Sequence, residues 1–251
     1  MQRFFLEVAY KGTNYSGFQV QQNANSIQAE VENALSVLFR QQFNLTGSSR
    51  TDTGVHALQN FFHFDADINP SKKNIYNLNS ILPPDIVVKN FYEVDSSAHC
   101  RFDAVSREYK YFLYTRKNPF LQETAYYFPF KFNFEALQQA AQIITTHEDF
   151  TSFSKRKTQV KHFLCNVFHS YWAQERDQFV YTVISNRFLR GMVRGLVGTM
   201  LKVATGAISI EQFDKVFENK NCANADFSAP AHGLFLMKIN YKEGLLDNGI
   251  E

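Results

Sequence analysis

The nine residues from Ser49 to Ala57, which read SRTDTGVHA, separate two stretches rich in large apolar side chains. FRQQFNLTG precedes them and LQNFFHFDA follows them. The segment combines an arginine, two threonines, an aspartate and a histidine with Gly54, and glycine permits backbone turns that other residues resist. This composition predicts a polar loop between two strands, at residues 43–47 and 58–65, that presents side chains for chemistry.

Apolar spacing around this loop predicts an alternation of strands and helices over the first part of the chain. Large apolar side chains alternate over residues 3–10, which indicates a strand, and residues 85–94 read as another. A helix is expected over residues 27–38, with Asn25 or Ser26 as its N-cap, and a second over residues 71–81.

The second part of the chain repeats this rhythm. Its expected elements are a strand at 107–116, a helix at 133–145, a hairpin at 167–185 around Glu175–Asp177, a helix at 189–201, a helix opened by Ser209, and a last strand at 233–241. Hairpin-paired strands with helices between them predict an α+β fold with mainly antiparallel sheet. We place two domains at residues 1–100 and 101–251.

Composition excludes several classes of protein. Of 251 residues, 45% are apolar and 20% charged, as in ordinary globular proteins. The three cysteines form no C-x-x-C pair, which favours reduced thiols over a disulfide framework or a zinc site. No segment reads as a signal peptide or a membrane span. We therefore expect a cytoplasmic protein.

Positive charge is local rather than global. The net charge is only +2, yet three segments are basic. Residues 101–117 hold five basic and two acidic residues, whereas residues 155–162 and 187–202 each hold four Lys or Arg and no Asp or Glu. Such segments are either solvated faces or a footprint for a phosphate backbone.

Other motifs admit plainer interpretations. Gly12 and Gly17 have P-loop spacing, but Phe18-Gln19 stand where Lys-Ser/Thr is required, so nucleotide binding is rejected. Asp65 and Asp67 fit a polar strand end better than a metal site, and His56 and His63 are interpreted as structural. One expected helix contains three glycines, which indicate close approach of another element or of RNA: Gly191, Gly195 and Gly198.

Asp52 is the strongest candidate for chemistry in the polar loop. Burial alone raises a carboxyl pKa by up to about 3–5 units and would leave an aspartate protonated, whereas a nearby arginine lowers that pKa by about 1–3 units. A working aspartate in a closed site therefore needs a cationic partner. Arg50, Arg190 and Arg194 are the candidates, and Arg50 would share a face with Asp52 if the segment were a strand.

These residues resemble a known family. Residues 50–57, RTDTGVHA, resemble the R-T-D-x-G-V-H-A signature of the TruA family of tRNA pseudouridine synthases. Four further segments are similar to the family in the same order: YKGTNYSGFQVQQNANSIQAEVENAL, HCRFDAVSREYKYFLY, FLRGMVRGLVGTMLKVATG and APAHGLFLMKINY. The sequence departs from the usual pattern at Ser48-Ser49, Thr53, Gly191 and Gly195, and over residues 155–167, which concerns tRNA contacts more than the reaction.

The resemblance implies a fold and a mechanism. The fold would be two related halves, each similar to ferredoxin-like RNA-recognition folds, which form a continuous sheet with the active-site cleft between them. Asp52 would attack the target uridine, at C6 of uracil or at C1′ of ribose, and Arg194 would pair with Asp52. Tyr109 would lie against the flipped base, and Arg50 would assist flipping. No cofactor or metal is implied; the implied partners are the tRNA anticodon stem-loop, at positions 38–40, and a second copy of the chain.

Two other functions remain open at this point. An RNA-binding or chaperone module without catalysis would keep its function when Asp52 is replaced. A metal-dependent hydrolase that uses Asp52 with Asp65 and Asp67 would lose activity to a chelator.

Overall fold

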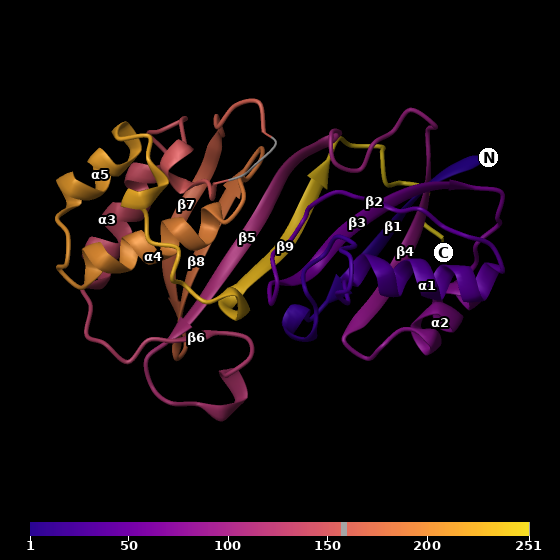
Figure 1. Ribbon diagram of the computed structural model, residues 1–251, viewed down its shortest axis with the longest axis horizontal. Helices are drawn as coiled ribbons and strands as arrows, with labels where there is room; N and C mark the ends of the chain where they lie inside the picture. Colours follow the sequence, from indigo (N-terminus) through magenta and orange to yellow (C-terminus); the bar gives the residue numbers. More distant parts are fainter. Residues whose placement is uncertain (157–159, 251) are drawn as a thin grey trace. The chain divides into compact units, whose positions relative to one another are not determined.

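The computed structural model describes residues 1–156 and 160–250, and the chain forms two compact units (Figure 1). Unit 1 comprises Met1–Val105 and the chain from Leu236 onward, and unit 2 comprises Ser106–Phe235. These units differ from the expected domains, because the last strand joins the first unit. The main-chain N–H of Ile239 donates to Oε1 of Gln59 at 2.9 Å, which ties this strand to unit 1.

Unit 1 is a sheet with two helices on one face. Its strand order is β4-β1-β3-β9, and β1 pairs antiparallel with both β3 and β4. Helices α1 and α2 lie side by side against this sheet (Figure 1). The elements are β1 (Gln2–Tyr10), α1 (Ile27–Phe39), β2 (Thr46–Gly47), β3 (His56–Ala66), α2 (Lys72–Ile81), β4 (Ile86–Val94) and β9 (Leu234–Tyr241), the last crossing the boundary between the units.

Strand β1 is buried on both faces. Phe4 packs its ring against Phe64, and Phe5 packs against Phe61 and Tyr241 on the opposite face. Alternation alone predicts one buried face, but β1 lies inside the sheet, and both its faces are covered. Two aromatic layers therefore fix the strand that leads into the polar loops of unit 1.

Unit 2 repeats the combination of antiparallel strands and helices. Strand β8 lies between β5 and β7 and pairs antiparallel with each, while the short β6 pairs parallel with β5. The bounds are β5 (Ala104–Tyr114), β6 (Tyr126–Tyr127), α3 (Phe134–Ile144), β7 (Val167–Glu175), β8 (Gln178–Ser185), α4 (Met192–Ala204) and α5 (Ile210–Glu218). Within this unit α3 contacts β7, α4 and α5.

The α+β class and the mainly antiparallel pairing are confirmed. The hairpin at 167–185 also forms as predicted, with Arg176 and Asp177 between paired Glu175 and Gln178. The continuous sheet and the cleft between the halves stay predictions. None of the helices among the described residues has the length and apolar character that crossing a membrane requires.

Two element boundaries differ from expectation for local reasons. The strand expected at 43–47 is reduced to Thr46–Gly47. The N–H of Leu45 donates to Oε1 of Glu32 at 2.9 Å, so it is not available for a hydrogen bond to a neighbouring strand. Helix α4 starts at Met192 rather than near Leu189, because Gly191 has a φ of +74° and acts as the N-cap. Gly191 therefore precedes the helix instead of lying within it.

Candidate active site

The polar segment forms a loop between β2 and β3. The N–H of Val55 donates to the carbonyl of Asp52 at 3.1 Å, which closes a turn with Gly54 at a φ of +79°. A positive φ at this position of a turn favours glycine. The segment is not a strand, so the condition under which Arg50 would share a face with Asp52 is not met. Arg50 is exposed, whereas Asp52 is half-buried.

Buried hydrogen bonds hold the loop from below. Thr51 Oγ1 lies 2.8 Å from the hydroxyl of Tyr10. Nδ2 of Asn60 donates to that hydroxyl at 3.1 Å and to the carbonyl of Ser49 at 2.8 Å. Asn60 is fully buried, so these bonds exclude water from the base of the loop. Asp52 thus projects from a fixed backbone, a role for Tyr10 and Asn60 that the sequence did not reveal.

Gly12 and Gly17, the two glycines with P-loop spacing, do not bind a nucleotide. They pack closely against the loop that carries Asp52. A Cβ on Gly12 would lie 2.0 Å from the carbonyl oxygen of Val55, and one on Gly17 would lie 3.1 Å from that of Thr51. The N–H of Gly12 also donates to Nδ1 of the buried His56 at 3.0 Å. Gly12 therefore allows two backbones to touch beside Asp52, which explains why this segment is glycine-containing.

Replacing Gly12 with alanine should destabilise unit 1 and misplace Asp52. The added methyl group meets main-chain atoms that cannot rotate away, so we expect a loss of about 2–3 kcal/mol in the free energy of unfolding. Chemical denaturation of the wild-type and Gly12→Ala proteins measures this difference in the free energy of unfolding. Thr13→Ala is the matched control, because Thr13 is exposed in the same short helix. A Gly12→Ala protein as stable as the wild type would contradict the close packing of Gly12 against the Val55 main chain.

Tyr109 lies on β5 of unit 2, opposite Val183 of β8. Its ring meets that of Phe188 edge to face, with 4.8 Å between centroids and 76° between planes. Only 8% of Tyr109 is exposed. Phe188 comes from the chain between β8 and α4, so one connection both orients Tyr109 and leads into the helix that carries Arg194.

Arg194 lies in the first turn of α4. A cation there opposes the helix dipole, so its position needs another explanation than helix stability. Nε donates to the carbonyl of Ala229 at 2.6 Å and Nη2 to that of Phe227 at 3.4 Å. Among the described residues of unit 2, no carboxylate pairs with this guanidinium, so its charge remains available to an anion.

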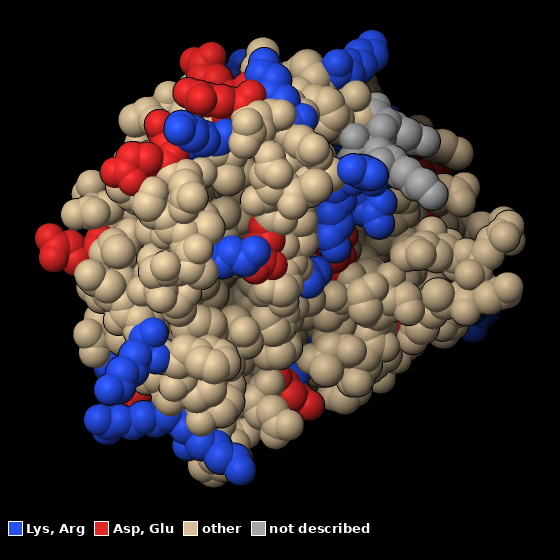
Figure 2. Space-filling view, turned by 60° about the vertical axis from the view of Figure 1, so that its left-hand side comes forward, with Lys and Arg blue, Asp and Glu red and all other residues tan. Residues whose placement is uncertain are grey.

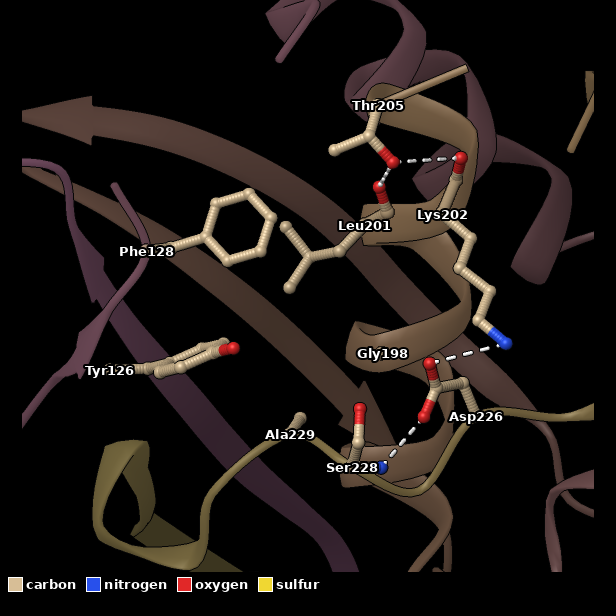
Figure 3. Close-up of a pocket in the computed structure, with 9 residues that line it drawn as sticks. All are labelled: Tyr126, Phe128, Gly198, Leu201, Lys202, Thr205, Asp226, Ser228 and Ala229. Atoms are coloured by element: carbon tan, nitrogen blue, oxygen red, sulfur yellow. Dashed lines mark hydrogen bonds and ion pairs between the residues drawn. The ribbon is translucent and has the colours of Figure 1, made fainter. Parts of the chain in front are cut away.

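The segment that supplies these carbonyls is itself fixed on α4 (Figure 3). Asp226 accepts from the N–H of Ser228 at 2.8 Å and pairs with Lys202 at 3.3 Å. A Cβ on Gly198 would lie 2.3 Å from the Asp226 carbonyl oxygen, and one on Gly195 would lie 2.8 Å from the Phe227 ring. The close approach that these glycines indicated is therefore to another segment of the same chain, the Asp226 carbonyl and the Phe227 ring, rather than to RNA.

A pocket of about 110 Å³ opens beside this anchored segment. In Figure 3 the rings of Tyr126 and Phe128 lie on one side of it, facing Leu201 of α4. Its polar groups already bond one another, since Lys202 pairs with Asp226. The pocket therefore borders the support of Arg194, and its polar groups maintain that support.

The four predicted site residues are divided between the units. Asp52 and Arg50 belong to unit 1, and Tyr109 and Arg194 belong to unit 2. The Tyr109 ring packs on Phe188, which lies in the short connection from β8 to the helix that carries Arg194, and Asp52 lies on a braced turn. The pairing of Asp52 with Arg194 stays a prediction.

Comparison with known proteins assigns the chain that forms this site to a family. The family model described as tRNA pseudouridine synthase matches residues 7–103 and 140–242. The chain belongs to this family. The matched ranges contain the Asp52 loop and the first turn of α4, whereas Tyr109 lies between them.

Relatives with the same name match the chain along almost its entire length. A protein named tRNA pseudouridine synthase A from Parabacteroides distasonis is 42% identical over 98% of both chains. One from Bacteroides thetaiotaomicron is 41% identical over 98% of this chain and 93% of its own. One from Staphylococcus aureus MRSA252 is 38% identical over 97% of this chain and 94% of its own. The family resemblance stated from the motifs is thereby confirmed.

Basic side chains of this family member occur in several separate groups on the face shown in Figure 2. Not all Lys and Arg side chains of the chain are available to a phosphate. Arg107 is buried and donates to the Asn186 carbonyl at 2.9 Å, and Lys202 is occupied by Asp226. Lys155 and Arg156 pair with no carboxylate among the described residues. Lys157, which the basic segment 155–162 includes, lies outside the described residues.

A cluster of His63, His99 and Cys100 in unit 1 has the composition of a metal site, with one donor atom from each within 4.8 Å of the others. Hydrogen bonds within the chain account for the positions of these donor atoms. Nδ1 of His63 accepts the N–H of Cys100 at 3.4 Å, and Nδ1 of His99 accepts that of Arg101 at 3.1 Å. The Cys100 thiol donates to the Thr46 carbonyl at 3.2 Å. A cation would have to displace these bonds, which favours the structural interpretation of His63.

Acidification should weaken the fold through His63. Burial, with smaller contributions from His99 and Arg3, lowers the pKa of His63 to about 4. An unfolded histidine has a pKa of about 6.5, so between these pH values the unfolded state binds more protons. The free energy of unfolding should therefore fall as the pH falls from about 6.5 to about 4.

Denaturation at several pH values measures this dependence. In His63→Asn, whose amide oxygen can replace the Nδ1 acceptor, the slope should flatten. The control is His169→Asn, because His169 is exposed. Parallel profiles for His63→Asn and the wild type would contradict the role of His63.

Proposed function

We propose that this protein isomerises uridine to pseudouridine in the anticodon stem-loop of tRNA, at positions 38–40. Membership of the tRNA pseudouridine synthase family supports this proposal. The observation that carries it is the braced turn at Asp52: a half-buried carboxylate on a rigid backbone, within a segment that has the family signature. A non-catalytic RNA-binding module would not require that rigidity around one aspartate.

The reaction can proceed with the chain's own side chains. The Asp52 carboxylate attacks C6 of the uracil or C1′ of the ribose, and the C1′–N1 bond breaks. The uracil turns, C5 bonds to C1′, the proton on C5 leaves to solvent, N1 takes up a proton, and the bond to Asp52 is released. Atoms balance without an added reactant, since the product is an isomer of the substrate.

The other proposed site residues prepare this step. A stacked uridine must be extruded before a side chain can reach it, at a cost of a few kcal/mol. Arg50 is exposed beside the turn, where it can assist that extrusion. Stacking of the flipped base on an aromatic ring contributes about 1–3 kcal/mol, the role proposed for Tyr109. Arg194 would pair with Asp52 and offset the negative charge of its carboxylate.

Further parts of the proposal follow from the family resemblance. We propose a homodimer in which tRNA contacts both chains, acting in the cytoplasm. Exposed aromatic side chains in unit 2, such as Phe120 at 91% and Phe130 at 62% exposure, offer apolar surface for a second copy. Sedimentation of the purified protein tests the dimer, because a monomer at every concentration would contradict it.

Mapping of pseudouridine on an unmodified tRNA transcript tests the activity. The transcript carries uridine at 38, 39 and 40, and carbodiimide adducts of pseudouridine are read as stops in primer extension. Stops confined to the anticodon arm are expected. The matched control transcript has cytidine at those three positions and should give no stops. A bound transcript without any stop, or with stops only in other arms, would contradict the proposal.

A further inference from the structure

A basic pocket lies in unit 2 beside the connection that leads to Arg194. Its volume is about 330 Å³. It is lined by Thr151, Ser154, Lys155, Arg156, Phe163, Lys220, Asn221 and Cys222. Cations, hydroxyl groups, an amide and one aromatic ring are the side chains that RNA-binding sites combine, and ligand pockets have volumes of about 300–1,000 Å³.

The charge of the pocket is only partly compensated. Lys220 pairs with Asp149, with 2.9 Å between Nζ and Oδ2. Lys155 and Arg156 have no carboxylate partner within the described residues. The pocket therefore keeps an excess of positive charge, which suits a phosphate group.

Lys155 is held in place rather than loose. Its carbon chain packs on Gly191, where a Cβ would come within 3.1–3.2 Å of it. Its ammonium group lies over the ring of Phe227, 6.0 Å from the centroid. Its N–H donates to the carbonyl of Arg190 at 2.9 Å. These contacts limit the rotamer entropy that Lys155 loses on binding a phosphate.

The same contacts connect the pocket to the candidate active site. The Lys155 ammonium lies over the Phe227 ring, and the Phe227 carbonyl accepts a hydrogen bond from Nη2 of Arg194. Gly191, under the Lys155 carbon chain, is the N-cap of the helix that carries Arg194. A phosphate held by Lys155 would therefore lie close to the support of Arg194.

We infer that this pocket binds one nucleotide of the tRNA backbone outside the uridine that reacts, with the phosphate on Lys155 and Arg156 and the base against Phe163. The inference rests on the proposed function for the identity of the RNA. The pocket thus sets affinity and register, while the chemistry remains at Asp52.

The salt dependence of tRNA binding tests this site. Each phosphate contact adds about 0.7–0.9 to the slope of log K against log salt. In Lys155→Ala/Arg156→Ala the affinity for an unmodified transcript should fall about 10-fold or more and the slope should decrease by about one to two. Lys72→Ala/Lys73→Ala removes the same charge from the exposed start of α2 and is the matched control.

The outcomes separate the pocket from the activity. Unchanged affinity and slope in the double variant would overturn the inference, as would a loss equal to that of the Lys72/Lys73 control. A wild-type protein that binds tRNA without modifying it would contradict the proposed function and still report on the pocket.

A probe on Cys222 locates the nucleotide directly. Cys100 and Cys165 are buried, whereas Cys222 is partly exposed at the pocket wall. An iron–EDTA group attached there should cleave the bound tRNA at one short stretch of backbone, and Cys222→Ser protein treated alike should not. Scattered cleavage, or none above that control, would overturn the inference.

Discussion

Replacing Asp52 with asparagine is expected to lower the rate of pseudouridine formation by at least about 10³-fold, since loss of a nucleophile removes the step itself. Asparagine keeps the size of the side chain and leaves the Val55-to-Asp52 main-chain bond in place. The fold and the affinity for tRNA should therefore stay close to wild type. Single-turnover assays with saturating enzyme measure the rate.

Thr53→Ala is the matched control for Asp52→Asn. Thr53 is the next residue in the same turn and is exposed. Its rate should stay within about threefold of wild type, in line with surface substitutions elsewhere. An Asp52→Asn protein that retains a tenth of the wild-type rate would remove Asp52 from the mechanism.

Replacing Arg194 with alanine is expected to reduce the same rate by about 10²–10³-fold, the range typical of a lost electrostatic partner in a closed site. Arg194→Lys should recover little, because one ammonium group cannot donate to the Ala229 and Phe227 carbonyls and also reach an anion. Single-turnover rates at saturating tRNA measure both variants, and Lys131→Ala controls for loss of a positive charge from unit 2.

The partner of Asp52 is tested by combining variants. If Arg194 acts through Asp52, Asp52→Asn/Arg194→Ala should be little slower than Asp52→Asn alone, because residues that act as a unit are not additive. Arg190→Ala should lack this coupling. A full additive loss with Arg194, or coupling with Arg190 instead, would contradict the assignment.

Patterns that depend on neighbouring residues in sequence predicted the local structure well. Residues 27–38 carry a helical apolar stripe after Ser26, whose side chain accepts the N–H of Ala29 at 3.2 Å as an N-cap should. The hairpin at 167–185 follows from two apolar runs around a polar turn. Such signals need no knowledge of tertiary contacts.

Features that depend on distant contacts escaped prediction. The last strand joins unit 1 through contacts such as that of Tyr241, whose hydroxyl donates to the Cys100 carbonyl at 2.6 Å, and no local pattern records this. The close packing of Gly12 against Val55 likewise joins residues far apart in sequence. Gly12 was visible as unusual, but whether it faced a ligand or a backbone required the tertiary structure.

The candidate site shows the same division. The residues at 50–57 pointed to Asp52 because their identity and order match a family signature. Arg50 and Asp52 would share a face only if the segment were a strand, and the turn at Gly54 means that it is not one. Tyr10 and Asn60 brace the loop from two different strands, so only the pairing register could reveal them.

Release of tritium from tRNA labelled at C5 of uridine tests the central claim most directly. Formation of the C5–C1′ bond expels the C5 hydrogen, so each isomerisation frees one tritium into water. We predict that the wild-type protein releases tritium from uridines of the anticodon arm with EDTA present and that Asp52→Asn releases none above background. Release by both proteins alike, or by neither although both bind the tRNA, would contradict the account.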